Sequence, residues 1–149
     1  MNNLIYYILA FVAGFGLTMQ AGVNSQLRAT LGNPVLAAMV SFLIGTFSLL
    51  IYILIFERNN LGVLNNLRGM QWHKWTGGLI GAFFVTGVVI FAPRIGAANT
   101  ACLIIAGQVL FALFLDHYGY LGFTQHTFNL LRFAGAVLVI SGVFLILRN

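Results

Sequence analysis

Apolar residues fill five long stretches of the chain, and short polar connections separate them. The stretches, by residue number, are 4–23, 34–56, 75–91, 97–115 and 128–147. A helix needs about 20 residues to cross about 30 Å of hydrocarbon, and each stretch comes near that length. The pattern therefore predicts an all-α integral membrane protein with five transmembrane helices, in which residues 1–149 form a single transmembrane domain.

Several residues mark where these helices are expected to begin and end. Asn33 is placed to cap the second helix, with Pro34 in its first turn, where a missing N–H costs nothing. Pro93 is expected to close the third helix, and Thr127 is a candidate cap for the fifth. No Lys or Arg precedes the first stretch and no clear cleavage site follows it, so we expect it to be retained rather than removed as a signal peptide.

The composition agrees with a membrane location. Apolar residues make up 60% of the chain and charged residues 6%, whereas soluble domains carry about 25% charged residues. The net charge is +5, but the seven basic residues are scattered along the chain. Nucleic-acid binding needs clustered basic side chains, so we expect no nucleic-acid partner. Cations at the ends of apolar segments instead favour contact with membrane lipids.

The residues that carry enzyme chemistry are nearly absent. The two acids, Glu57 and Asp116, lie at the ends of apolar stretches, and all three histidines lie outside the stretches. The sequence has no nucleophile beside a base and no metal-ligand spacing. We therefore expect no enzyme activity, no catalytic residue, no cofactor and no metal site. No carboxylate lies in mid-membrane, where proton-driven carriers usually place a titratable group.

The end of the first stretch carries an unusual polar row. If its helix continues past Met19, then Gln20, Asn24 and Arg28 are spaced i, i+4 and i+8 on one face. Polar groups at membrane depth should face another helix, a water-filled cavity or the headgroups. This reading makes the three residues candidates for binding a solute. The alternative is that the membrane ends at Gln20 and an interfacial loop follows.

Two further sets of polar residues are candidates for solute binding. Gln108 lies in the middle of the fourth stretch, too far from either end to reach the interface, and Asn99 lies near its start. Gln108 either lines a cavity or makes a structural hydrogen bond between helices. Arg28 and Arg94, near the ends of the first and third stretches, favour neutral, zwitterionic or anionic solutes over cations. The alternative is that both arginines hold phospholipid headgroups.

The chain resembles a known family in a series of short motifs. These are Gln20-x3-Asn24-x2-Leu27-x4-Gly32-x-Pro34, Ser41-Phe42-x2-Gly45, Gly77-Gly78 with Gly81, Gly107-Gln108, and Asp116-His117-Tyr118-Gly119. Together they resemble the half-size, five-helix YdcZ-like branch of the drug/metabolite transporter (DMT) superfamily. The resemblance implies a bacterial inner-membrane transporter whose five helices form one inverted-repeat unit. Full-length relatives have two such repeats with the substrate site between them, which would place Gln20, Asn24 and Gln108 in the central cavity.

One departure bears on the substrate. Small multidrug carriers of the same superfamily use a membrane-embedded glutamate in the first helix to bind cations and protons. The middle of that helix here reads Ala13-Gly14-Phe15-Gly16. This departure argues against proton-coupled export of cationic compounds, which stays an alternative to transport of a small metabolite. A non-transporting scaffold or accessory subunit is the other alternative.

The distribution of basic residues predicts how the chain inserts. With five crossings, one side of the membrane receives Arg58, Arg68, Lys74 and Arg132, and the other receives Arg28, Arg94 and Arg148. A difference of one gives almost no orientation bias. A lone repeat can build a two-sided midplane site only with an inverted copy. We therefore expect insertion in both orientations and an antiparallel homodimer. A heterodimer with an inverted paralogue, a parallel dimer and a monomer are the alternatives.

Overall fold

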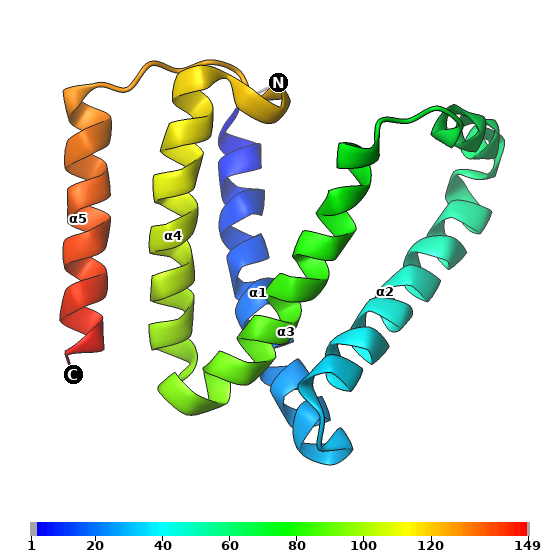
Figure 1. Ribbon diagram of the computed structural model, residues 1–149, viewed down its shortest axis with the longest axis horizontal. Helices are drawn as coiled ribbons and strands as arrows, with labels where there is room; N and C mark the ends of the chain where they lie inside the picture. Colours follow the sequence, from blue (N-terminus) through cyan, green and yellow to red (C-terminus); the bar gives the residue numbers. More distant parts are fainter. Residues whose placement is uncertain (1–2, 149) are drawn as a thin grey trace. The chain divides into compact units, whose positions relative to one another are not determined.

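The computed structural model describes residues 3–148 and contains five long helices (Figure 1). They are α1 (Asn3–Leu31), α2 (Pro34–Phe56), α3 (Thr76–Ile95), α4 (Ala97–Tyr118) and α5 (Leu130–Leu147). Short 3-10 segments, η1 (Arg58–Leu67), η2 (Trp72–Trp75) and η3 (Tyr120–Gly122), lie in the connections. All five helices are long and apolar enough to cross a membrane. The all-α membrane fold predicted from the sequence is confirmed.

The helices fall into two compact units that divide near the end of α3. The first unit runs to Pro93 and holds α1, α2 and most of α3, and the second begins at Arg94 and holds α4 and α5. Each unit is described by itself below. That residues 1–149 form one transmembrane domain stays a prediction, as does the portion of each helix that lies in lipid.

In the first unit, α1 and α2 form a helical hairpin. Gly32 takes a positive φ of 69° after α1 ends, a conformation that a residue without a Cβ adopts freely. Asn33 then caps α2, its side-chain oxygen accepting hydrogen bonds from two backbone amides of the first turn, and Pro34 opens the helix. Ala37 and Ala38 are buried on this turn of α2, where small side chains let helix backbones approach closely.

The first and third helices are longer than the sequence suggested. The first helix does not stop at residue 23 but continues to Leu31, so the polar row after Met19 is helical and the loop interpretation is wrong. Its 29 residues span roughly 43 Å, more than the hydrocarbon thickness. Pro93 does not close the third helix, which continues to Ile95. A proline so near the C-terminal end interrupts a single intrahelical hydrogen bond and leaves few residues to distort.

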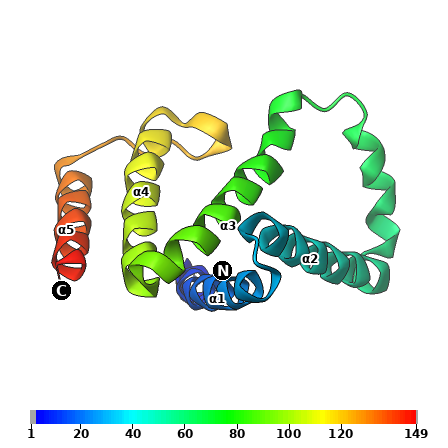
Figure 2. The same ribbon diagram turned by 60° about the horizontal axis from the view of Figure 1, so that its bottom comes forward.

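The second unit is a pair of antiparallel helices, α4 and α5, which lie side by side in both ribbon views (Figures 1 and 2). The fourth helix runs to Tyr118, past the predicted end at residue 115, and Gly119 ends it in the left-handed conformation. Asn129, not Thr127, caps α5, because its side chain accepts the backbone N–H of Arg132.

Most hydroxyls in the long helices bond to their own helix. In seven cases a Ser or Thr hydroxyl donates to the backbone carbonyl four residues earlier. The donors are Thr18, Ser25, Thr30, Thr46, Ser48, Thr100 and Ser141. This arrangement leaves no unpaired hydroxyl proton facing lipid at these positions.

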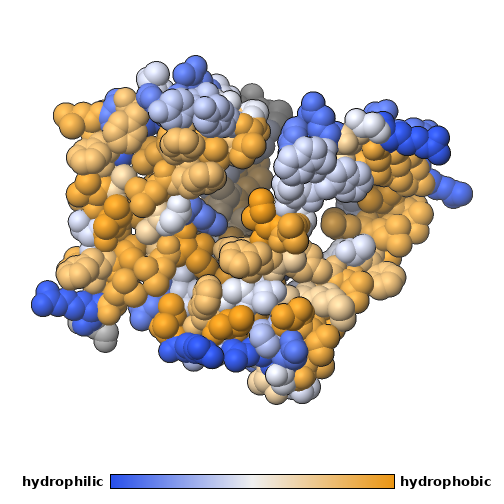
Figure 3. Space-filling model, viewed as in Figure 1, coloured by the Kyte–Doolittle hydropathy of each residue, from blue (hydrophilic) through white to orange (hydrophobic). Residues whose placement is uncertain are grey.

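The surface distribution of polarity fits a membrane protein. In Figure 3 the apolar colour covers the lengths of the helices, and the hydrophilic colour gathers near helix ends and connections. Large apolar side chains such as Phe11, Phe47 and Phe83 are at least 62% exposed. In water such a surface would aggregate, whereas lipid or another helix covers it without cost.

Candidate functional site

The three residues of the polar row on α1 lie on one face of the helix but differ in their exposure. Gln20 is exposed, Asn24 is 4% exposed, and Arg28 is half-buried. Because the helix is continuous from Asn3 to Leu31, these residues lie one turn apart on the same side, as the sequence predicted. Gln26 is exposed, and its spacing puts it off this line. Of the three residues in the row, Asn24 and Arg28 are therefore the ones that the rest of the protein covers.

Asn24 is a buried amide without a partner. It makes no hydrogen bond with any described residue, although 96% of its surface is covered. Among residues 3–148, no side-chain nitrogen or oxygen is both fully enclosed and unpaired. The Asn24 amide therefore keeps a narrow opening, through which water or a ligand group can reach it. A carboxamide can both donate and accept, so it suits many polar solutes.

Arg28 reaches from α1 to α3. Its Nη1 donates a hydrogen bond to the backbone carbonyl of Val89, at 3.1 Å. In an unbroken α-helix this carbonyl would accept the N–H of residue 93, but residue 93 is proline and has none. Val89 is fully buried, so its free carbonyl needs a donor that water does not supply there. The guanidinium of Arg28 provides it.

The sequence interpretation missed the Val89 carbonyl. It took Pro93 as the end of a helix and Arg28 as a side chain facing solute or headgroups. The signal that could have revealed the contact is the proline itself, because a proline inside a helix always frees the carbonyl four residues before it. A basic residue at the end of a neighbouring helix is a natural donor for that carbonyl.

Arg94 and Asn99 lie near the junction of α3 and α4. Arg94 is exposed and makes no hydrogen bond or ion pair with a described residue. Asn99 is half-buried in the first turn of α4. Its neighbour Thr100 is 4% exposed but donates its hydroxyl to the carbonyl of Gly96 at 2.8 Å. Thr100 is therefore satisfied locally, and the solute-binding roles of Arg94 and Asn99 stay predictions.

Gln108 is exposed on α4 and makes no hydrogen bond with residues 3–148. It lies on the opposite side of the helix from Leu110 and His117, which line the groove shared with α5. The structural hydrogen bond considered for Gln108 is thus absent between α4 and α5. An amide in the middle of an apolar helix still needs a partner, which leaves a solute or another helix to supply it.

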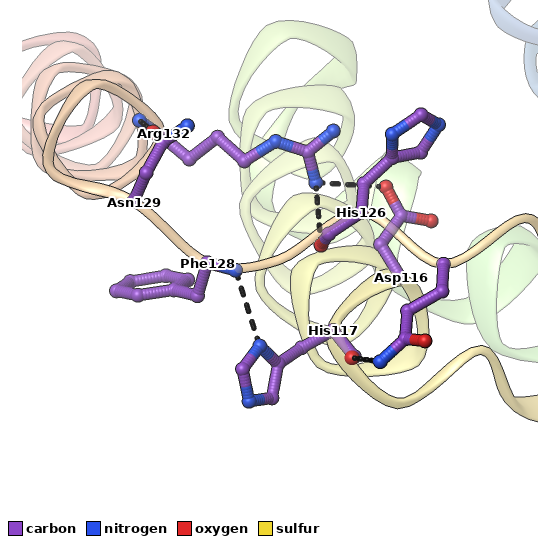
Figure 4. Close-up of polar contacts among 7 residues, drawn as sticks. Asp116, His117, His126, Phe128, Asn129 and Arg132 are labelled. Atoms are coloured by element: carbon purple, nitrogen blue, oxygen red, sulfur yellow. Dashed lines mark hydrogen bonds and ion pairs between the residues drawn. The ribbon is translucent and has the colours of Figure 1, made fainter.

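The start of α5 is fixed to the end of α4 by a group of polar contacts (Figure 4). Arg132 forms an ion pair with Asp116, at 3.1 Å between Nη1 and Oδ2, and the same nitrogen donates to the carbonyl of His126. The ion pair uses one of the two acids of the chain, so that carboxylate is already neutralised.

One contact in this group of residues depends on the tautomer of His117. Its Nδ1 accepts the backbone N–H of Phe128 at 3.1 Å, so the ring carries its proton on Nε2. We expect His117→Ala to lower the unfolding free energy by about 1 kcal/mol, because a backbone donor loses its acceptor. In His117→Asn, the side-chain oxygen can replace Nδ1, and stability should be largely kept. Thermal melting of both variants in detergent checks this, and equal losses would contradict it.

An open apolar groove of about 570 Å³ runs between α4 and α5. Aliphatic and aromatic side chains line most of it, among them Leu113, Phe114 and Phe133, and His117 lies in its wall. Such a lining offers few partners to a polar solute, so the candidate site for polar chemistry is the row on α1 and the amide on α4.

Comparison with known proteins identifies the family. A model of the family described as "Putative inner membrane exporter, YdcZ" matches residues 5–145. The chain belongs to this YdcZ family. It is similar to the inner membrane protein YdcZ of Escherichia coli (strain K12), with 27% identity over 153 residues that cover 100% of this chain and 99% of the relative. No solved structure matches the chain significantly.

Membership in the YdcZ family confirms the resemblance drawn from the motifs. It also confirms a multi-pass inner-membrane location and a general transport role rather than an enzymatic one. The family description names no substrate, and the residues that bind the solute stay predictions.

Proposed function

We propose that this YdcZ-family protein moves a small neutral, zwitterionic or anionic metabolite across the inner membrane by alternating access. The observation that carries the proposal is Asn24, a polar side chain that is 96% buried and has no hydrogen-bond partner in residues 3–148. The amide keeps a narrow opening, so a group of a bound solute can reach it and complete its hydrogen bonds. A few placed polar groups of this kind fix the orientation of a ligand and give a binding site its specificity.

The charges of the helices support the choice of substrate class. Both acids already have partners, since Asp116 pairs with Arg132 and Glu57 accepts a hydrogen bond from Asn60. Arg28 has no carboxylate partner among the described residues. A path beside Arg28 is then neutral or positive, which disfavours cations. This is the ground for preferring a metabolite to the cationic compounds of multidrug exporters.

The working assembly that we propose is an antiparallel homodimer, in which each chain is one inverted repeat. Most large apolar side chains on the five helices are exposed in the single chain, so much surface is available to a second copy. The near balance of basic residues, four against three, permits both orientations. A heterodimer with an inverted paralogue uses the same surfaces and is distinguished by co-purification.

Transport by the purified protein tests the function. The protein is reconstituted into vesicles and offered a panel of radiolabelled amino acids, organic acids and sugars. We expect at least one solute to exchange across the membrane, and Asn24→Leu to reduce that exchange to the level of empty vesicles. If no solute moves and the protein always purifies with another polypeptide, the scaffold function is correct instead.

Labelling in intact cells tests the orientation. Cys102 is removed, and single cysteines are placed at Asn65 in η1 or at Ala97 at the start of α4, which are exposed and should lie on opposite sides. We expect an impermeant maleimide to label both positions to similar extents, because both orientations are present. Labelling at one position alone would rule out dual insertion. A permeant maleimide, which reaches every cysteine, is the control.

A further inference from the structure

The hydrogen bond between Arg28 and Val89 joins α1 to α3 within the first unit. Arg28 donates from one nitrogen, Nη1, to one carbonyl, at 3.1 Å. A guanidinium has five N–H donors in a rigid, planar fork. The other donors of Arg28 have no partner among residues 3–148. The guanidinium is therefore held at one N–H group, and its other N–H groups are available to a ligand.

Pro93 is what makes the anchor possible. Any other residue at position 93 would donate its own N–H to the Val89 carbonyl and so compete with Arg28. The anchor point is itself rigid, because Val89 is fully buried within α3. A long arginine side chain normally loses much rotamer freedom when it binds a ligand. Because the hydrogen bond to Val89 already restricts the guanidinium before a ligand binds, part of this entropy loss does not occur on binding.

The surroundings of the fork select the charge of its ligand. Neither Glu57 nor Asp116 pairs with Arg28, so its positive charge is not neutralised by a carboxylate of the described chain. Asn24 lies one turn away on the same face of α1, also without a partner among residues 3–148. A carboxylate or phosphate oxyanion can accept two parallel hydrogen bonds from the guanidinium. A neighbouring polar group of the same ligand can then bond to the carboxamide of Asn24.

We propose that Arg28 and Asn24 bind an oxyanion, the carboxylate or phosphate group of the transported solute, and that Pro93 positions Arg28 by freeing the Val89 carbonyl. This inference rests on the proposed transport function and narrows its substrate to anions and zwitterions. The same chemistry occurs in phospholipid headgroups, so the experiment must separate a soluble ligand from a lipid.

Ligand-dependent thermal stabilisation in lipid-free detergent tests the site. The probes are benzoate, inorganic phosphate and benzamide, an uncharged analogue of benzoate. We expect benzoate or phosphate, but not benzamide, to raise the melting temperature of the natural protein. Arg28→Ala should abolish the shift, and Arg28→Lys, which keeps the charge but not the fork, should weaken the affinity by about tenfold. An equal shift with benzamide would overturn the site.

The role of Pro93 is tested with the second proline of the chain as a matched control. Pro93→Ala should weaken benzoate affinity by about threefold or more, because alanine at this position takes over the Val89 carbonyl. Pro34→Ala, at the first turn of α2, should leave the affinity unchanged. In the Pro93→Ala background, Arg28→Ala should lower the melting temperature less than it does alone, since the carbonyl then has a donor. Equal losses in both backgrounds would overturn the positioning role.

Phosphatidylglycerol in nanodiscs separates the two sources of oxyanion. If it stabilises the protein through Arg28 while benzoate and phosphate have no effect, Arg28 binds headgroups and the solute site is wrong.

The oxyanion site and the transport function can also fail separately. Binding that depends on Arg28 without any solute movement in vesicles supports the site and contradicts transport. Solute movement that survives Arg28→Ala unchanged contradicts the site and leaves transport intact.

Discussion

The double substitution Asn65→Lys with Asn66→Lys is expected to abolish transport without touching any candidate solute-binding residue. Both positions are exposed in η1, far along the chain from Asn24. The change raises the basic residues on that side of the membrane from four to six, against three on the other. Such a bias fixes nearly all chains in one orientation. An antiparallel homodimer then cannot form, and transport in cells should fall to background.

A variant with the opposite bias should restore transport. Replacing Arg58 and Arg68 by glutamine and Ala97 by lysine leaves two basic residues on the η1 side and four on the other. We expect each biased variant to be inactive alone and the two to be active when expressed together, because they supply opposite orientations. Expression level is monitored by immunoblot.

The control replaces Asn65 and Asn66 by glutamine, which changes both residues but adds no charge. It should transport like the natural protein. Full activity of the lysine variant expressed alone would show that dual insertion is not needed. A parallel dimer, a monomer or a partner of another sequence would then be the working form.

Gln108→Leu is expected to reduce transport by about tenfold, the effect of losing a hydrogen bond to solute. The fold should not suffer, because Gln108 makes no hydrogen bond with residues 3–148 and is exposed. Unfolding free energy should change by no more than about 0.5 kcal/mol. Transport in vesicles and melting in detergent measure the two effects on the same preparation.

Gln26→Leu is the matched control for this change. Gln26 is also an exposed helical glutamine whose side chain makes no hydrogen bond within residues 3–148, but it lies off the row of Asn24 and Arg28. It should transport normally. If Gln108→Leu instead melts at a clearly lower temperature and transports normally, the amide bonds to another helix and has no role in solute binding.

Local signals in the sequence were enough for the number of helices and for some of their ends. Asn33 and Pro34 mark the start of α2 because capping depends on residues adjacent in the chain. The start of α5 was misplaced because Thr127 and Asn129 are both good caps, and only the structure shows that Asn129 accepts the Arg132 amide. Two competing local signals cannot be ranked from sequence alone.

Contacts between distant residues could not be predicted. Arg28 and Val89 are 61 positions apart, and Arg132 and Asp116 are 16 apart. The rule that proline ends a helix considers only the lost hydrogen bond, not a donor from another helix that replaces it. The row of Gln20, Asn24 and Arg28 could be placed on one face from its spacing. The strong burial of Asn24 against the exposure of Gln20 depends on packing that spacing does not encode.

The hydroxyls that bond within their own helices have a consequence for biogenesis. A segment leaving the translocon meets lipid before it meets its neighbours, so a hydroxyl donor without a partner is costly at that stage. Ser48 and Ser141, which lie inside α2 and α5, are already paired with Ile44 and Val137. These two hydroxyls therefore need no partner from a second helix when their segments enter the bilayer.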